Sequence, residues 1–333
     1  MHRPDFWYPR ERRLPWPAFF VLPLSLVWQG LGCLRAHFAK NWKAPCPVIC
    51  VGNAVVGGTG KTPIVLALGH DLAIKGVNVH IVSYGYKGRR RGPLRVDLKR
   101  HDYRDVGDEA LLLAQIAPTW IGRNRAAAIA LAAKNGADLV LVDDGLQNPH
   151  FFKDLSFLVV DGEEGFGNGL IVPAGPLRER PATALGRANA LIVMGDGVAG
   201  KEIAERMRHL TKPVIESRLS PALETPDIRG RRLIAFAGIG RPEKFARQLR
   251  DLGGEVIELC SFDDHHIYNE TDADRLLALA IGHNASLITT EKDRVRLPQR
   301  LKNISLVFPV RALFKDRELF SNLIKSLIPE KTT

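Results

Sequence analysis

The sequence is poor in the residues that build metal and disulfide frameworks. Its 333 residues include only four cysteines, at positions 33, 46, 50 and 260, and no two of them form a C-x-x-C pair. This argues against a zinc ribbon or a disulfide scaffold and fits a reducing compartment. The H-R-D and D-F-G motifs of protein kinases are missing. The sequence also contains no internal repeat and no low-complexity tract.

The composition is that of a folded protein with a strongly basic balance. Hydrophobic residues make up 45% of the chain and charged residues 25%, and the length allows two modest domains or one large one. The net charge is +11 and the pI is near 9.7. Such a charge favours polyanionic partners, which include nucleic acid, anionic lipid headgroups and phosphorylated substrates.

The strongest local signal is the stretch from Pro47 to Leu66, PVICVGNAVVGGTGKTPIVL. An apolar run typical of a strand leads into a glycine-rich loop, and an apolar helical pattern follows Lys61 and Thr62. This order is typical of a P-loop, in which backbone N–H groups surround phosphate oxygens, the lysine reaches the β- and γ-phosphates and the threonine ligates Mg²⁺. The strict pattern has glycine where this chain has Val55. The sequence predicts nucleotide binding by Gly57, Gly58, Thr59, Gly60, Lys61 and Thr62.

A second signal is the run ADLVLVDDGLQ over residues 137–147. A continuous apolar segment that ends on Asp143 and Asp144 indicates a buried parallel strand with carboxylates at its carboxyl end. In a P-loop protein this is the Walker B position, where an aspartate helps to hold Mg²⁺. A simple turn or helix cap is the structural alternative for the same pair.

The rest of the chain alternates between strand and helix patterns. We expect an α/β protein with a P-loop NTPase-like parallel sheet core over residues 46–225 and a second, smaller α/β domain over residues 226–333. The long loop over residues 162–181, rich in glycine and proline, is of a length that is usually functional.

Residues 14–34 carry no charged side chain, although three prolines interrupt them and arginine and lysine residues flank them on both sides. The length would span a bilayer, and the flanking tryptophans suit the headgroup interface. A buried core helix is the alternative. We expect residues 1–45 to form a membrane-associated helical segment that is interfacial rather than spanning.

Several polar groups have both a structural and a functional interpretation. Asp108 and Glu109 open an apolar helix, where acidic residues are common because they complement the helix dipole. The basic run over residues 87–104 is either a solvated loop or a site for an anionic substrate or lipid. His265 and His266 follow a strand beside two aspartates, a poor metal site but an ordinary setting for a general base. The Thr290–Asp293 segment does not match the guanine-reading element, because its lysine directly precedes its aspartate.

Taken together, the motifs resemble the tetraacyldisaccharide 4′-kinase family, the lipid A 4′-kinases of Gram-negative bacteria. The matching stretches run in family order from about residue 47 to 297: VGNAVVGGTGKTP, SYGYKG, GDEALLLA, GRNR, LVDDGLQ, PAGPLRE, DDHHIY and TTEKDRVRL. The chain departs from the family pattern at residues 83–88, SYGYKG, where S-R-G-Y-G-G is common, so that Tyr84 and Lys87 differ. It departs again at Asp263, where proline is common.

The resemblance implies specific residue roles. It implies that Asp108 is the base that takes the hydroxyl proton, that His265 supports it, and that Lys61 neutralises the phosphates. It implies Mg²⁺ ligation by Thr62, Asp143 and Asp144. Secondary contacts to the metal or the substrate are implied for Glu109, Arg123, Arg178 and Glu179.

The implied reaction is transfer of the ATP γ-phosphate, with Mg²⁺, to the 4′-hydroxyl of a tetraacylated glucosamine disaccharide 1-phosphate. The expected partners are this glycolipid, ATP and the inner-membrane lipid surface, with no nucleic acid. The expected location is the cytoplasmic face of the inner membrane, where the chain would be peripheral or anchored by its N-terminus.

Two other functions remain open at this stage. One is a membrane-associated P-loop ATPase or GTPase of the switch or motor type, which would need a water-positioning residue in place of a base. The other is a basic nucleic-acid-binding protein, which predicts steep salt dependence and leaves Lys61 and Thr62 without a role.

Overall fold

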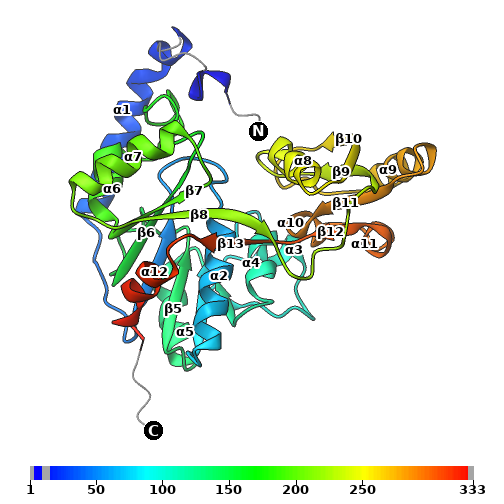
Figure 1. The fold of residues 1–333 in the computed structure, drawn as a ribbon. Helices are drawn as coiled ribbons and strands as arrows, with labels where there is room; N and C mark the ends of the chain where they lie inside the picture. Colours follow the sequence, from blue (N-terminus) through cyan, green and yellow to red (C-terminus); the bar gives the residue numbers. More distant parts are fainter. Residues whose placement is uncertain (1–3, 10–15, 329–333) are drawn as a thin grey trace.

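A computed structural model describes residues 4–9 and 16–328, and it confirms the predicted α/β class. The described residues form a larger domain around a nine-stranded sheet, a smaller domain around a four-stranded sheet and an N-terminal helix (Figure 1). The arginines at positions 3, 10, 12 and 13 and the first residues of the apolar segment lie outside the described residues.

The large sheet is parallel except at its two edges. Its spatial order is β13 (Val310–Phe314), β8 (Val214–Pro221), β7 (Ala190–Met194), β6 (Leu155–Asp161), β1 (Val48–Gly52), β5 (Leu139–Asp143), β2 (Val79–Ser83), β4 (Thr119–Ile121) and β3 (Leu94–Arg95). Only β13 and β3 pair antiparallel with their neighbours. The carboxyl ends of the parallel strands therefore lie along one edge, where ligands bind in open α/β sheets.

Every residue of β1, β5 and β6 is buried, because helices cover both faces of the sheet. One face packs against α2 (Lys61–Ile74), α4 (Asp108–Leu113) and α12 (Arg317–Lys325). The other face packs against α5 (Arg125–Lys134), α6 (Pro181–Arg187) and α7 (Val198–His209). The short helix α3 (Tyr103–Val106) precedes α4.

The smaller domain repeats the same layered design. Its all-parallel sheet has the order β10 (Glu255–Ser261), β9 (Arg232–Ala237), β11 (Ser286–Thr290) and β12 (Leu306–Phe308). Its helices are α8 (Pro242–Asp251), α9 (Glu270–Gly282), α10 (Glu291–Arg294) and α11 (Gln299–Ile304). Helix α8 covers one face, and α9 and α11 cover the other.

The end of the chain returns to the large domain, which differs from the expectation that residues 226–333 form one subdomain. Strand β13 pairs with β8, and α12 packs on the core beside α2. The chain thus enters the small domain after β8 and leaves it at Pro309. The two connections lie side by side, since the Ala222 N–H and the Thr225 hydroxyl both donate to the Pro309 carbonyl.

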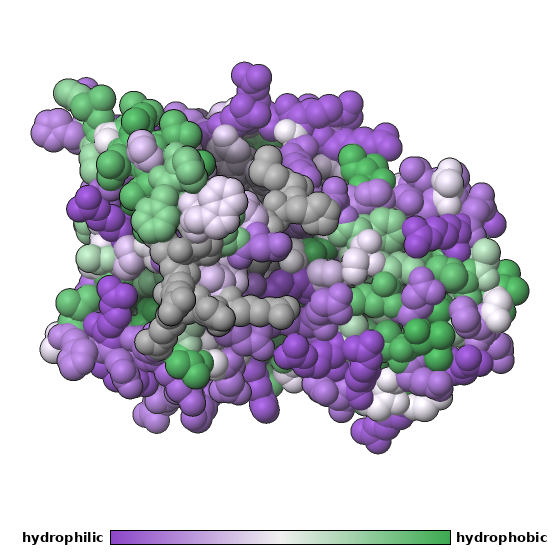
Figure 2. All heavy atoms as spheres, turned by 90° about the horizontal axis from the view of Figure 1, so that it is seen from above, coloured by the Kyte–Doolittle hydropathy of each residue, from purple (hydrophilic) through white to green (hydrophobic). Residues whose placement is uncertain are grey.

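Helix α1 (Trp16–His37) is apolar and exposed on most of its surface. It is long and apolar enough to cross a membrane, and only 11% of its most apolar window is buried. Hydrophobic residues gather at the end of the molecule where α1 lies (Figures 1 and 2). Ser25 fixes the helix to the long loop, because its hydroxyl donates to the Ile171 carbonyl and accepts from the Ala174 N–H.

The return of the chain predicts the effect of one core substitution. Phe320 of α12 is fully buried, stacks on Phe314 with ring centroids 3.9 Å apart and lies 5.5 Å from the Phe157 ring. Phe320→Ala leaves a cavity and should lower the free energy of unfolding by about 3–5 kcal/mol, measured by urea denaturation. Phe152, which is 42% exposed, provides the matched control. An equal effect of the two alanine substitutions would contradict the packing of α12 on the core.

Candidate active site

The phosphate loop joins β1 to α2 at the carboxyl edge of the sheet. Gly57 and Gly60 have φ angles of 115° and 85°, which favour glycine. Val55 instead forms a β-bridge with Leu177, so the chain needs no glycine at that position. In the described part of the chain, the backbone N–H groups of residues 57–60 donate to no protein acceptor. These free donors at the start of α2 fit a bound phosphate.

Asp144 follows β5 and pairs with the positively charged side chains beside the phosphate loop. Its carboxylate lies 2.9 Å from the Arg178 guanidinium and 3.7 Å from Lys61 Nζ. Its φ is 54°, a strained value for a residue other than glycine. Burial alone would raise the pKa of Asp144, but the charges of Lys61 and Arg178 hold it at about 2. The carboxylate is therefore ionised and already paired.

Asp143, unlike Asp144, has a carboxyl oxygen without a partner among the described residues. It is buried, and its Oδ1 has no hydrogen-bond partner. The pKa of Asp143 is raised to about 7, mainly by burial and next by the negative charge of Glu109. Across the described residues, no three histidine, cysteine, aspartate or glutamate side chains gather into a metal site. An unpaired carboxylate beside the phosphate loop still fits Mg²⁺, which uses one or two carboxylates together with substrate phosphates and water.

Asp108 is the first residue of α4, and its position depends on Gly107. Gly107 has a φ of 87°, and a Cβ atom there would lie 2.4 Å from the Tyr86 carbonyl oxygen. Only glycine fits this approach, which brings Asp108 to the edge of the sheet beside the end of β2. The Asp108 side chain is buried, and its Oδ1 accepts from the Glu109 N–H at 2.8 Å.

His265 comes from the small domain and meets Asp108. Its Nδ1 lies 2.8 Å from Asp108 Oδ2. Burial alone would raise the pKa of Asp108, but the hydrogen bond from His265 and the nearby positive charges hold it at about 2. An ionised carboxylate can only accept, so Nδ1 carries the proton. The sequence alone could not establish this contact.

Lys292 of α10 completes the cluster. Its Nζ lies 3.1 Å from Glu109 Oε1 and 3.2 Å from His265 Nε2. Burial would lower the pKa of Lys292, but Glu109 and Asp108 raise it above its usual value. The ammonium group therefore donates to Nε2 and fixes the neutral form of His265 with its proton on Nδ1.

A cavity of about 230 Å³ opens over this cluster. Asp108, His265, Ile267 and Arg296 form part of its wall. Basic and aromatic residues from the run after β2 form the rest: Lys87, Arg89, Tyr103 and Arg104. Lys87 also crosses to the small domain, where its Nζ donates to the Asp264 carbonyl at 3.1 Å. The basic run thus adjoins Asp108 and is more than a solvated loop.

Two of the predicted substrate contacts, Arg123 and Glu179, lie apart from the Asp108–His265 pair. Arg123 is exposed, and its guanidinium lies 5.9 Å from the centre of the Tyr84 ring. Glu179 forms an ion pair with Arg187 at 3.1 Å and accepts from the Gln147 amide. Neither side chain contacts Asp108 or His265.

A second group of ion pairs joins the domains at the end of β6. Arg241 and Lys244 of the small domain both bind Asp161, and Lys244 also lies 2.8 Å from Glu163. Burial would raise the pKa of Asp161, but Arg241 holds it at about 2. The small domain is thus attached to the large one at two places along the same edge.

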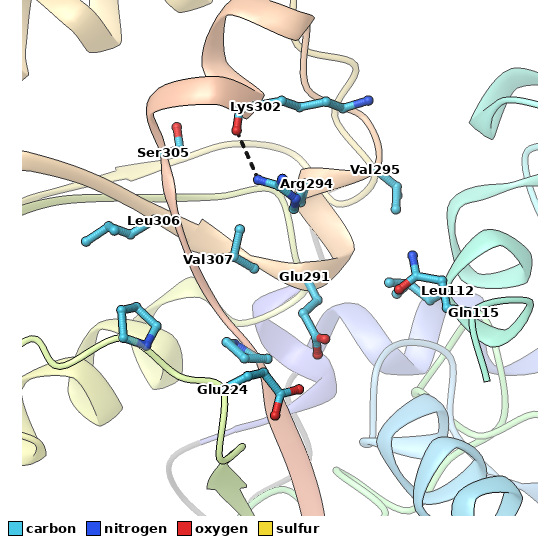
Figure 3. A pocket seen from close by; sticks show the side chains of 12 residues that line it. Leu112, Gln115, Glu224, Glu291, Arg294, Val295, Lys302, Ser305, Leu306 and Val307 are labelled. Carbon is cyan, nitrogen blue, oxygen red and sulfur yellow. Dashed lines mark hydrogen bonds between the residues drawn. The ribbon is translucent and has the colours of Figure 1, made fainter. Parts of the chain in front are cut away.

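A larger cavity of about 630 Å³ lies between the domains on the side of the two connections (Figure 3). Leu112 and Gln115 line it from the large domain, while Glu291 and Arg294 line it from α10. Arg311 bridges two of the lining residues, with ion pairs to Glu224 at 2.6 Å and to Glu291 at 2.8 Å. Helix α10 therefore has this cavity on one side and the Asp108 cluster on the other.

The sequence predictions missed four residues of this region. Lys292 and Arg296 lie in a stretch that matched the family, but no periodicity or spacing places them beside Asp108. Asp161 and Arg241 are 80 residues apart, and only the tertiary structure pairs them. The proline after Arg241 opens α8, a signal that gives its place but not its partner.

Comparison with known proteins places this arrangement in one family. The LpxK family, described as tetraacyldisaccharide-1-P 4′-kinase, matches residues 17–328. The tetraacyldisaccharide 4′-kinase of Parvibaculum lavamentivorans is 50% identical over 325 residues, which are 95% of each chain. That of Rhodospirillum centenum is 44% identical and covers 99% of this chain and 98% of its own length.

A solved structure supports the same conclusion. The crystal structure of LpxK from Aquifex aeolicus in complex with ATP has a TM-score of 0.73 and 26% identity, and the match covers 94% of this chain and 100% of that one. The chain belongs to the tetraacyldisaccharide 4′-kinase family.

Proposed function

We propose that this protein transfers the γ-phosphate of ATP to the 4′-hydroxyl of a tetraacylated glucosamine disaccharide 1-phosphate, a step of lipid A biosynthesis. The observation that carries the proposal is the meeting of Asp108 and His265 at 2.8 Å, on the sheet edge that also holds the phosphate loop. The 50% identity to a tetraacyldisaccharide 4′-kinase supports the same reaction.

The phosphate loop is proposed to hold the nucleotide. ATP, bound with Mg²⁺, supplies the phosphoryl group and part of the charge neutralisation. The free N–H groups over residues 57–60 surround the phosphates, Lys61 neutralises the β- and γ-phosphates, and Thr62 lies at the start of α2 as a metal ligand. Positioning and charge, rather than covalent chemistry, are what this reaction requires.

The acidic residues are proposed to divide the metal contacts unequally. Asp144 is already paired with Lys61 and Arg178, so it orders the loop. It would contact the metal while it keeps these two ion pairs. Asp143 has an unpaired buried oxygen and is the better candidate for a direct or water-mediated contact. Glu109 is held by Lys292 and serves as a secondary contact.

Asp108 is proposed to accept the proton of the attacking hydroxyl. Neutral His265 donates to it and holds its orientation, and Lys292 fixes the His265 tautomer. Because the carboxylate is ionised, it can act as a base as soon as a hydroxyl group enters the 230 Å³ cavity.

The acceptor is proposed to enter through the basic wall of that cavity. Lys87, Arg89 and Arg104 suit an anionic glycolipid, since cationic side chains bind phosphate oxygens. Arg123, Arg178 and Glu179 remain proposed substrate contacts at the rim of the site. Helix α1 is proposed to keep the protein at the cytoplasmic face of the inner membrane, either as a peripheral protein or with this helix as its anchor.

The deciding experiment measures transfer of label from γ-labelled ATP to the glycolipid in Mg²⁺ and mild detergent. Asp108→Ala should reduce transfer by about 10²- to 10⁴-fold while ATP binding persists, because it removes the base. His265→Ala should reduce it less. His266, which bonds to Asp272 instead, is the matched control. ATP hydrolysis without labelled lipid would favour a switch-type ATPase, and an unchanged Asp108→Ala rate would refute the base.

The phosphate loop gives a second prediction. Lys61→Ala removes the charge that faces the phosphates and should abolish transfer in the same assay. Lys75→Ala, at the far end of the same helix and exposed, should leave the rate within about twofold. Substantial activity in Lys61→Ala would rule out the proposed nucleotide site.

The N-terminal segment gives a third prediction, on membrane binding. Deletion of residues 1–40 removes α1 and should release the protein from vesicles of anionic lipid, because the exposed apolar surface is lost. Sedimentation with the vesicles measures this, with the full-length chain as control. If the shortened chain still sediments, another surface binds the membrane.

A further inference from the structure

Arg296 is a buried arginine in the small domain, and it reaches across to the large domain. Its side chain is only 2% exposed. Its Nε lies 3.4 Å from Asp108 Oδ2, the same oxygen that accepts from His265. Two side chains of the small domain therefore converge on one carboxylate oxygen of the proposed base.

The guanidinium is held rigidly from behind. Its Nη2 donates to Asp293 Oδ1 at 2.5 Å and to the Gly238 carbonyl at 3.1 Å. Asp293 is fully buried and is itself fixed by the Tyr268 hydroxyl and the Gly238 N–H. This network lies within the small domain, so contacts of its own domain hold the Arg296 guanidinium in place.

The other donors of Arg296 are not used within its own domain. Among the described residues, Nε and Nη1 are buried and make no hydrogen bond. An arginine that served only to stabilise the small domain would be expected to pair these donors there, because unpaired buried donors are costly. Instead, Arg296 lines the 230 Å³ cavity together with Asp108 and His265.

The contacts leave little freedom for the Asp108 carboxylate. Oδ1 accepts from the Glu109 N–H in its own helix, and Oδ2 faces His265 and Arg296. The first contact is present in the large domain alone. The other two exist only when the small domain is docked, so docking is what fixes the carboxylate plane.

We propose that Arg296 is a positioning residue that, together with His265, orients the Asp108 carboxylate when the small domain docks. This inference rests on the proposed function, in which Asp108 is the base. Arg296 acts through its charge and its fixed direction, and it leaves nucleotide binding to the phosphate loop of the other domain.

The first test compares Arg296→Gln and Arg296→Lys in the labelled transfer assay. Arg296→Gln should lower kcat at least tenfold and leave KM for ATP within twofold, and Arg296→Lys should recover a large part of the loss. Arg300→Gln is the control, since Arg300 is an exposed arginine paired with Asp274 in the same domain. A kcat for Arg296→Gln within threefold of the wild type, or no recovery with lysine, would overturn the proposal.

Thermal unfolding of each variant separates positioning from stability. If Arg296→Gln does not fold, Arg296→Lys, which keeps the buried charge, carries the test alone. It should then fall between the wild type and Asp108→Asn in kcat, again with an unchanged KM for ATP. A value equal to that of Asp108→Asn would count against the proposal.

A double-mutant cycle with Asp108→Asn separates the positioning role of Arg296 from the proposed function, in which Asp108 is the base. If Arg296 acts through Asp108, Arg296→Gln should cost less than threefold once Asp108 is replaced. Full additivity with a slow Asp108→Asn variant would refute the role of Arg296 and leave the base in place. A wild-type rate for Asp108→Asn would refute the proposed function itself.

Discussion

The docking of the small domain on the carboxyl edge of the large sheet is the contact on which the site depends. Its main contacts are at two places, Asp161 at the end of β6 and Asp108 at the start of α4. Arg311 of β13 adds an ion pair to Glu291 of α10. The phosphate loop lies on β1, between the strands that lead to these two places. Partially buried ion pairs of this kind are directional and require good geometry, so they favour one relative placement of the domains.

Much of the fold could be predicted because its strands are buried on both faces. Continuous apolar runs ending in Gly52 and Asp143 mark such strands directly, and their carboxyl ends indicate the functional edge. Strand β8 was harder to recognise, because its exposed and buried residues alternate through Glu216 and Arg218. Strand β13 depends on β8 for its pairing, so residues 310–328 were expected in the wrong domain.

Part of the site could be predicted from local sequence, and part depends on tertiary contacts. The phosphate loop is a local structure, and its glycines and Lys61 follow one another in the sequence. The conformation around Asp108 is also partly local, since Gly107 is required by the nearby Tyr86 carbonyl. Arg296 is different, because the carboxylate that it faces, Asp108, lies in another domain and its neighbours in sequence are ordinary for a helix end. Nothing short of the assembled domains indicates that it faces Asp108.

The 630 Å³ cavity beside the two connections makes the relative placement of the domains dependent on the solvent. Its walls belong to both domains, so any rotation of the small domain changes its volume. The cavity has room for on the order of twenty water molecules. A rotation of the small domain would therefore move water between this cavity and bulk solvent, so hydrostatic pressure and osmolytes excluded from the cavity should change the relative placement of the domains.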